Sequence, residues 1–216
     1  MGLSRQHEAW GLGELLRRYP GLSIRPQKGG TILLTGEVEF VAKRSGFEEI
    51  SDSYAIEIHV PRSFPRELPT VKETAGRIPR TFHTSSDETL CLGSTLRLFL
   101  HLNRNPTLVG FIESCLIPYL YGHTYKERHG QMPFGELAHG ADGILQDCMT
   151  MFGVGDQRTA RQLFLLLGIR KRLANRRPCP CGSGQRLGRC HNRVLNRFRK
   201  LQSRSWFRRQ YQRLVD

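Results

Sequence analysis

Three cysteines and a histidine gather near the C-terminal end of the chain. Cys179 and Cys181 lie on either side of Pro180, and Cys190 and His191 follow after eight further residues. Thiolate sulfur and imidazole nitrogen are ligands that Zn²⁺ prefers, and four of them complete its tetrahedral shell. We therefore predict a zinc site with the ligands Cys179, Cys181, Cys190 and His191.

The residues between these ligands suit a metal loop. Pro180 stiffens the first turn, and Gly182 and Gly184 can adopt the positive φ angles needed where a backbone wraps an ion. A segment this short buries too little apolar surface to fold alone, so metal binding would supply the folding free energy. Four protein ligands leave no open position for water, which indicates a structural role and not a catalytic one.

Residues 178–192 resemble the zinc motif at the C-terminus of the SecA translocation ATPase, known as SEC-C. The pattern C-x-C-G-S-G-x5-C-H of that motif is matched at every position from Cys179 to His191. The resemblance implies a zinc-bound module that binds proteins and that is also found attached to unrelated domains.

A second candidate for chemistry is Cys91, in the run Leu90-Cys91-Leu92-Gly93. This run would also fit a buried strand in which Cys91 is only a small apolar side chain. Three features favour a nucleophile: the polar residues 81–89 precede it, His83 lies eight residues before it, and Gly93 allows close approach of the backbone to another group.

The order of parts over residues 1–152 resembles the ubiquitin-conjugating-enzyme (UBC) fold. That family has an N-terminal helix, an antiparallel sheet, a Y-P-x-x-P-P turn, a His-Pro-Asn loop, a catalytic Cys-Leu and then helices. The chain offers Phe64-Pro65 with Pro69 for the turn, Cys91-Leu92 for the nucleophile, and Asn105-Pro106 for the start of the next helix. The match covers about two thirds of the chain, and it implies that Cys91 carries an acyl group as a thioester.

The His-Pro-Asn triplet is absent, and His83 stands where that family has its asparagine. An imidazole can donate a hydrogen bond to an oxyanion or accept a proton from an attacking amine. We therefore expect His83 to act beside Cys91. Asp87 and Glu88 would either orient an incoming lysine or simply be solvated.

Prokaryotic relatives of this fold in antiphage operons resemble the chain more closely than the eukaryotic enzymes do. The resemblance implies a transthiolase that transfers a protein C-terminus. The donor would be a nucleotidyltransferase resembling the cyclic-dinucleotide synthases, or a ubiquitin-like modifier. No glycine-rich nucleotide loop or adenylation motif is present, so the chain would either rely on a separate activating enzyme or accept a preformed acyl group.

Three other functions remain open. One is a non-catalytic UBC-fold adaptor, although inactive relatives lack the cysteine. Another is a nucleic-acid or ribosome binder that acts through the basic zinc tail. A cysteine hydrolase that uses Cys91 and His83 is the last, but no third orienting group is evident.

Positive charge is concentrated at the C-terminal end. Residues 1–155 hold 16 Lys+Arg and 17 Asp+Glu, whereas residues 156–216 hold 17 Lys+Arg and 2 Asp+Glu. A segment this basic is expected to meet phosphate, acidic protein or an anionic surface. We expect a basic helical linker at 156–177 and a basic C-terminal helix at 193–216, with Arg197, Arg204 and Arg208 in contact with the partner.

The patterning predicts an α+β fold. Apolar periodicity predicts helices at 4–19, 106–121, 134–151, 156–175 and 193–214, with Asp156 as a cap. Alternation predicts strands at 31–41 and 54–60, a hairpin loop at 43–53, an extended proline-rich connection at 61–69 and a short strand at 68–73.

The remaining cysteines and histidines are predicted to be structural or superficial. Cys115 and Cys148 lie on apolar helical stripes and His101 is also assigned to structure, while His123 and His129 fall in a predicted surface loop at 121–132. There is no apolar run long enough to span a bilayer and no signal-peptide pattern at the N-terminus. We therefore expect a cytoplasmic protein with reduced thiols.

Overall fold

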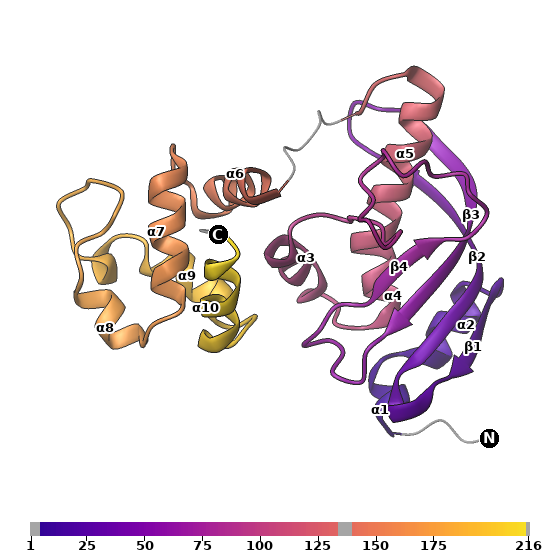
Figure 1. Cartoon of the computed structure of the whole chain (residues 1–216), viewed down its shortest axis with the longest axis horizontal. Coiled ribbons are helices and arrows are strands. Elements are labelled where there is room, and N and C mark those ends of the chain that lie inside the picture. The colour runs from indigo at the N-terminus through magenta and orange to yellow at the C-terminus, as the bar shows by residue number, and fades with distance from the viewer. Residues whose placement is uncertain (1–4, 134–139, 215–216) are drawn as a thin grey trace. The chain divides into compact units, whose positions relative to one another are not determined.

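The computed structural model describes residues 5–133 and 140–214, and the chain divides into two compact units (Figure 1). Unit 1 is Met1–Glu136 and unit 2 is Leu137–Asp216. Strands occur in unit 1 and helices in both, so the predicted α+β class is confirmed. None of the described helices combines the length and the apolar character needed to cross a membrane.

Unit 1 begins with two short helices, α1 (Arg5–Ala9) and α2 (Leu12–Arg18), where a single helix at 4–19 was predicted. The break lies at Gly11, whose φ of 70° is left-handed and cannot continue a right-handed helix. Trp10, Leu12 and Leu15 are buried on either side of this break. The apolar stripe was therefore predicted correctly, but it is shared by two helices.

Four antiparallel strands form one sheet in the order β1-β2-β3-β4. They are β1 (Leu22–Pro26), β2 (Ile32–Lys43), β3 (Glu49–Val60) and β4 (Thr70–Glu73). The predicted strands at 31–41 and 54–60 and the short strand near 68–73 are confirmed. The predicted loop at 43–53 is wrong, because β2 and β3 stay paired as far as Lys43 opposite Glu49.

The alternation of β2 and β3 places one face of the sheet in the core. Leu34 and Val38 on β2 and Ile56 and Ile58 on β3 are almost fully buried. Helix α5 (Ile117–His129) packs against both strands and covers this face (Figure 1). This apolar layer provides the rigid support on which the loop that carries Cys91 is built.

The segment 61–69 differs from the predicted extended connection. Its backbone folds back in turns, in which the N–H of Phe64 donates to the carbonyl of Pro61 and the N–H of Arg66 donates to that of Ser63. The Phe64–Pro65 peptide bond is cis. The indole N–H of Trp10 donates to the Phe64 carbonyl at 3.0 Å, which ties this turn to the N-terminal helices.

The helix predicted at 106–121 is longer than expected. It consists of α4 (Leu108–Phe111), a π-helical turn (Ile112–Leu116) and α5, and so continues to His129. Pro118 has no N–H for the carbonyl of Ser114, and a wider turn removes the clash of its ring. The imidazole Nδ1 of His101, from α3 (Thr95–Leu102), lies 3.2 Å from that carbonyl and can donate to it. The structural role predicted for His101 thus has a physical basis.

Unit 2 is a helical unit built from α6 to α10. Its helices are α6 (Gly140–Phe152), α7 (Gln157–Leu167), α8 (Lys171–Arg176), α9 (Asn192–Arg199) and α10 (Arg204–Gln212). Helix α7 contacts α6, α9 and α10, and its residues Leu163, Phe164 and Leu167 are buried. The segment 156–177 is therefore part of a core, where a linker was expected.

Three boundaries differ from the predicted ones. Helix α6 belongs to unit 2, although the predicted first domain extended to residue 152. The helices predicted at 156–175 and 193–214 are each interrupted, after Leu167 and after Arg199. Residues 134–139, where the predicted helix 134–151 would begin, lie outside the described residues. The cap at Asp156 is confirmed, because its carboxylate accepts the N–H of Thr159 at 2.7 Å.

Candidate metal centre and thiol site

The four predicted metal ligands come together in unit 2. Ligand atoms of Cys179, Cys181, Cys190 and His191 all lie within 4.8 Å of one another. The sulfurs of Cys179 and Cys190 are 3.2 and 3.1 Å from Nδ1 of His191. Cys181 Sγ lies 3.4 Å from Cys179 Sγ and 3.5 Å from Cys190 Sγ.

These separations fit a tetrahedral ion. With Zn–S bonds of about 2.3 Å and Zn–N bonds of about 2.0 Å, the edges of a tetrahedral site measure about 3.5–3.8 Å. Four of the six separations are 3.1–3.5 Å and all six are within 4.8 Å, so small shifts of the side chains would admit an ion. Three thiols and one imidazole therefore form a group that could hold a metal ion through Sγ and Nδ1 atoms.

Backbone hydrogen bonds shape the loop that carries these ligands. Pro178 and Arg186 form an isolated antiparallel bridge, and the N–H of Cys179 donates to the carbonyl of Gln185 at 2.8 Å. Gly182 and Gly184, inside the loop, have φ angles of 77° and 70°. The left-handed glycines expected from the sequence are thus present where the chain reverses.

The thiols of this group differ in acidity. Burial raises the pKa of Cys179 to about 11. Ser183 lowers the pKa of Cys181 to about 6, first through its side chain and then through its backbone. Of these two thiols, Cys181 is thus the more acidic, and thiolate is the form of cysteine that binds a metal ion.

Residues 178–193 match the SEC-C motif. The match covers the predicted zinc segment and includes all four ligands. Comparison with curated proteins and with solved structures gives no match for the chain.

Cys91 lies in unit 1 at the end of a narrow loop, and its side chain is exposed. The loop is closed by a bridge between Thr84 and Leu90 and by the N–H of Cys91, which donates to the carbonyl of His83 at 2.7 Å. Leu90 is buried, and its N–H donates to the carbonyl of Val71 on β4. The thiol is thus presented to solvent from a backbone that is anchored on both sides.

The two predicted catalytic residues, Cys91 and His83, are therefore joined by a backbone hydrogen bond. His83 has a φ of 39°, an uncommon value for a residue with a side chain, and its ring packs edge-on against Phe82. The hydroxyl of Tyr119 donates to the carbonyls of Phe82 and His83, at 3.0 and 3.4 Å. Burial raises the pKa of Tyr119, which keeps this donor protonated. Sequence reasoning missed Tyr119, because nothing in its local pattern links it to residue 83.

The acidic residues of the loop are engaged within it. The carboxylate of Glu88 pairs with Arg80, and that of Asp87 accepts the N–H of Thr89. Hydrogen bonds to Thr89 lower the pKa of Asp87. These contacts stabilise the loop and give no support to a role of either carboxylate in orienting a lysine.

Gly93, directly beyond Cys91, has a different reason from the one predicted. Its φ of 139° lies in the region that favours glycine, while an added Cβ would meet only Leu98 Cδ2, at 3.7 Å. Backbone conformation therefore accounts for a glycine here without close approach of another group of the described chain. Gly93 leads into α3, whose cap Ser94 accepts the N–H of Arg97.

The surface position predicted for His123 is wrong. Because α5 continues through the predicted loop 121–132, His123 is 3% exposed, and its Nδ1 lies 2.7 Å from the hydroxyl of Tyr54. That hydroxyl also lies 2.8 Å from the Thr124 hydroxyl, which donates to Asp52 at 2.7 Å. His129, at the end of α5, is exposed as predicted and contacts Glu48.

The number of available protons fixes the direction of this chain of hydrogen bonds. The Thr124 proton goes to the Asp52 carboxylate, so the Tyr54 proton must go to Thr124. His123 must then donate through Nδ1–H to Tyr54, because no other proton is available for that contact. Burial lowers the pKa of His123, so a neutral imidazole with its proton on Nδ1 satisfies every contact.

The network connects to the loop through an aromatic cluster. The ring centroid of Phe82 lies 4.7 Å from the ring centroid of His123 and 5.5 Å from that of Tyr119. At the other end, the guanidinium of Arg77 donates to both carboxylate oxygens of Asp52, at 2.9 and 2.7 Å. The backbone of residues 82–83 is therefore fixed by buried groups from β3 and α5.

The other cysteines have the structural roles predicted for them. Cys115 and Cys148 are buried, and burial raises the pKa of Cys115. Cys181 and Cys190 are partly exposed, but both belong to the metal group. Outside that group, Cys91 is the exposed cysteine.

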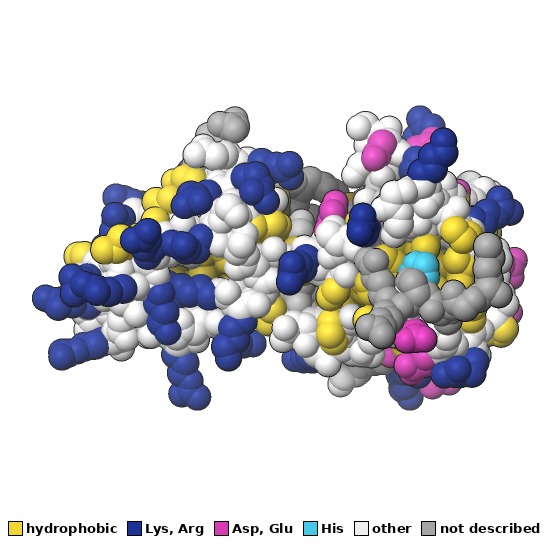
Figure 2. All heavy atoms as spheres, turned by 90° about the horizontal axis from the view of Figure 1, so that it is seen from below, with side chains coloured by type: hydrophobic (Ala, Val, Ile, Leu, Met, Phe, Trp, Pro, Cys, Tyr) yellow, Lys and Arg dark blue, Asp and Glu magenta, His cyan; other side chains and the backbone are white. Residues whose placement is uncertain are grey.

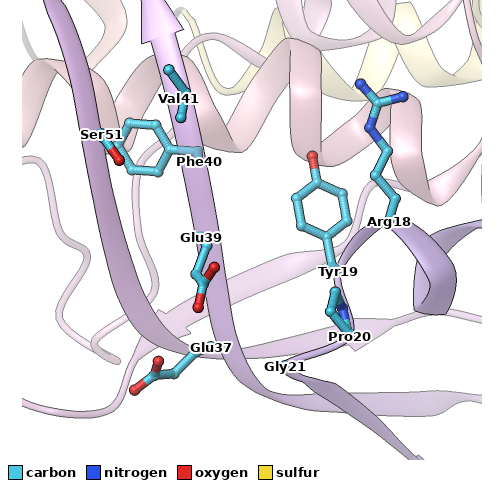
Figure 3. Close-up of a pocket in the computed structure, with 9 residues that line it drawn as sticks. All are labelled: Arg18, Tyr19, Pro20, Gly21, Glu37, Glu39, Phe40, Val41 and Ser51. Carbon is cyan, nitrogen blue, oxygen red and sulfur yellow. The ribbon is translucent and has the colours of Figure 1, made fainter.

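A separate hollow of about 290 Å³ lies between the end of α2 and strands β2 and β3. Figure 3 shows Arg18 and Tyr19 on one side and Glu37, Glu39 and Phe40 on the strand side. None of the predicted catalytic or metal-binding residues lines it. This hollow is therefore distinct from the surface around Cys91.

Proposed function

We propose that unit 1 is a ubiquitin-conjugating-enzyme-like domain that carries a protein C-terminus as a thioester on Cys91. The observation that carries this proposal is the exposure of the Cys91 thiol at the end of a closed loop. The backbone hydrogen bond from Cys91 to His83 closes that loop. A nucleophilic cysteine must be reached by a folded protein partner, and an anchored, exposed position provides that access.

The order of elements supports the proposal. Helices α1 and α2 precede a four-stranded antiparallel sheet, a proline-containing turn follows β3, and Cys91 comes before α3 to α5. This is the order expected for the UBC family that residues 1–152 resemble. Helix α5 covers the buried face of the sheet, and the Cys91 loop lies against the edge strand β4 through the N–H of Leu90.

The chemistry is two successive acyl transfers. The Cys91 thiolate attacks the carbonyl carbon of an activated C-terminus, and the activating group leaves with its electron pair. An amine then attacks the thioester, the C–S bond breaks, and Cys91 returns as a thiolate. His83 would stabilise the oxyanion by donating a hydrogen bond, or would accept the proton of the amine.

The resemblance suggests the partners. We infer that the acyl donor is a nucleotidyltransferase or a ubiquitin-like modifier in an antiphage system of a bacterial cytoplasm, and that a separate enzyme activates its C-terminus. The basis of this inference is the likeness of the sequence to prokaryotic UBC-like proteins.

We further infer that the ion held by unit 2 is zinc. Three sulfurs and one nitrogen form a donor set that suits Zn²⁺ and is unsuited to Mg²⁺ or Ca²⁺, which prefer oxygen. When bound, the ion would supply folding free energy to the loop. It would take no part in the chemistry at Cys91.

The proposal can be tested with a peptide whose C-terminus is a thioester of mercaptoethanesulfonate. We expect wild-type protein to acquire one peptide on Cys91, faster than glutathione does at the same pH, and to release it on treatment with hydroxylamine. Cys91→Ser should retain the peptide as an ester that added thiol does not cleave. His83→Ala should load normally but pass the peptide to free lysine more slowly.

Cys115→Ala is the matched control, because that thiol is buried in the same unit. It should load as wild type does. If Cys91→Ala still acquires the peptide, or if the folded wild-type protein reacts no faster than glutathione, the transthiolase proposal fails. Unit 1 would then be a non-catalytic adaptor.

A further inference from the structure

Unit 2 carries a large excess of exposed positive charge. Of its 17 Lys+Arg, the following 15 are exposed: Arg158, Arg170, Lys171, Arg172, Arg176, Arg177, Arg186, Arg189, Arg193, Arg197, Lys200, Arg204, Arg208, Arg209 and Arg213. No ion pair joins any of them to a carboxylate among the described residues. On the face shown in Figure 2, Lys and Arg side chains crowd unit 2. Within residues 5–133 and 140–214, no ion pair neutralises this charge.

The metal loop brings two groups of these arginines together. Arg176 and Arg177 end α8, while Arg186 and Arg189 follow the glycines of the loop. The N–H of Leu187 donates to the carbonyl of Arg177 at 2.9 Å, and Arg186 is bridged to Pro178. Segments ten residues apart in sequence thus lie side by side, and all four side chains are exposed. We refer to these four residues as the arginine cluster.

We propose that the arginine cluster binds the phosphate backbone of a nucleic acid, and that the metal loop assembles this surface. Thirteen of the 15 exposed cations are arginine. The guanidinium fork matches a phosphate with two parallel hydrogen bonds, whereas the lysine ammonium acts as a point charge.

The spread of the charge favours a polyanion over an acidic protein. Exposed arginines occupy α8, the metal loop and α9, where Arg193, Arg197 and Lys200 recur at helical spacing on one side. A nucleic acid carries phosphates at short, regular intervals and can contact all of these segments. A patch of carboxylates on a folded protein would cover only a part of them.

The test measures binding of the full-length protein to a 20-nucleotide mixed-sequence RNA and to DNA of the same sequence. We expect affinity for both to fall about 50-fold between 50 and 200 mM salt, as four phosphate contacts with a single-strand slope of about 0.7 each require. The combined variant Arg176→Glu, Arg186→Glu and Arg189→Glu should lower the salt slope by about 2 and affinity by about two orders of magnitude.

The matched control is Arg25→Glu, Lys28→Glu and Arg104→Glu, which makes the same charge change at exposed positions of unit 1. It should bind as wild type does. Cys181→Ser should weaken binding as strongly as the arginine variant, since the bridge between the two groups depends on the metal loop. Metal content shows whether the arginine variant keeps its loop folded.

Four results would overturn the proposal. They are a binding constant that does not change with salt, an equal loss of affinity in both triple variants, unchanged binding by Cys181→Ser, and competition by polyglutamate that matches competition by RNA. The last result would indicate an acidic protein as the partner. A preference for RNA over DNA or the reverse identifies which nucleic acid is bound.

Discussion

At the scale of single residues, the same side-chain type has different roles because its surroundings differ. Cys91 is an exposed thiol on an anchored loop, Cys115 and Cys148 are buried among apolar side chains, and Ser183 lowers the pKa of Cys181. Sequence spacing separated these groups correctly. What it did not provide was the burial of His123, whose neutral imidazole is one end of a chain of hydrogen bonds.

The first prediction concerns the metal ligands. Wild-type protein should contain one zinc per chain, measured by elemental mass spectrometry after purification without chelator. Cys181→Ser should lose most of this zinc, because a site left with three ligands binds far more weakly. Cys148→Ala is the control in the same unit: it should keep the zinc and lose stability through a core cavity. Metal-free wild-type protein would contradict the assignment.

At the scale of elements, buried polar contacts determine how helices and strands are joined. Pro118 removes a helical hydrogen bond, and the π-helical turn and His101 compensate for it. The Arg77–Asp52 pair links the loop after β4 to β3, and Thr124 extends this link to α5. Such contacts stabilise the packing of α5 and the loop after β4 against the sheet.

The second prediction is a loss of stability of unit 1 in acid. The Arg77 guanidinium lowers the pKa of Asp52 from 3.8 to about 2. Since the folded pKa lies below the ordinary one, the ionised carboxylate stabilises unit 1 above about pH 4, and its contribution is lost as the pH falls towards 2. His123 acts in the same direction. Because burial lowers its pKa in the folded protein, protonation of the imidazole in acid favours the unfolded state.

Urea unfolding at several pH values tests this effect. Trp10 reports unit 1 if Trp206 is replaced by Phe. In that background, Asp52→Asn should lower the free energy of unfolding at pH 7 by on the order of 1 kcal/mol. It should also flatten the dependence between about pH 4 and 2. An Asp52→Asn protein with the full wild-type acid dependence would show that other carboxylates are responsible.

At the scale of the whole molecule, the chain consists of two units of different build. Unit 1 has an extensive apolar core, whereas the segment 178–193 of unit 2 carries a Cys/His group that could hold a metal ion. The two units also differ in net charge. Unit 1 holds 16 Lys+Arg and 15 Asp+Glu, while unit 2 holds 17 and 4.

The third prediction is that metal removal destabilises one unit alone. With Trp10→Phe, the fluorescence of Trp206 reports unit 2, and a chelator should lower the temperature of its transition, because bound metal stabilises only the state that binds it. With Trp206→Phe, the transition reported by Trp10 should not change. A shift of both transitions by the same amount would mean that the two units unfold as one.

The sequence by itself determined those features that depend on residue type and local spacing. These are the metal ligands, the α+β class, strands β2 to β4, the cap at Asp156 and the concentration of basic residues towards the C-terminus. Each follows from a period, a motif or a composition that is visible within a short window of the chain. The separation of Cys91 from the other cysteines belongs with them.

Only the tertiary structure decided those features that depend on contacts between distant residues. The pairing of β2 with β3 makes the predicted loop shorter, and the contacts of α7 with α6, α9 and α10 place α6 and the supposed linker, which contains α7, in unit 2. Folding brings the Tyr119 hydroxyl within hydrogen-bonding distance of the carbonyls of residues 82–83, and the backbone of Leu187 within hydrogen-bonding distance of that of Arg177. No local pattern encodes such neighbours, since the free energy that selects them comes from burial and pairing across the whole unit.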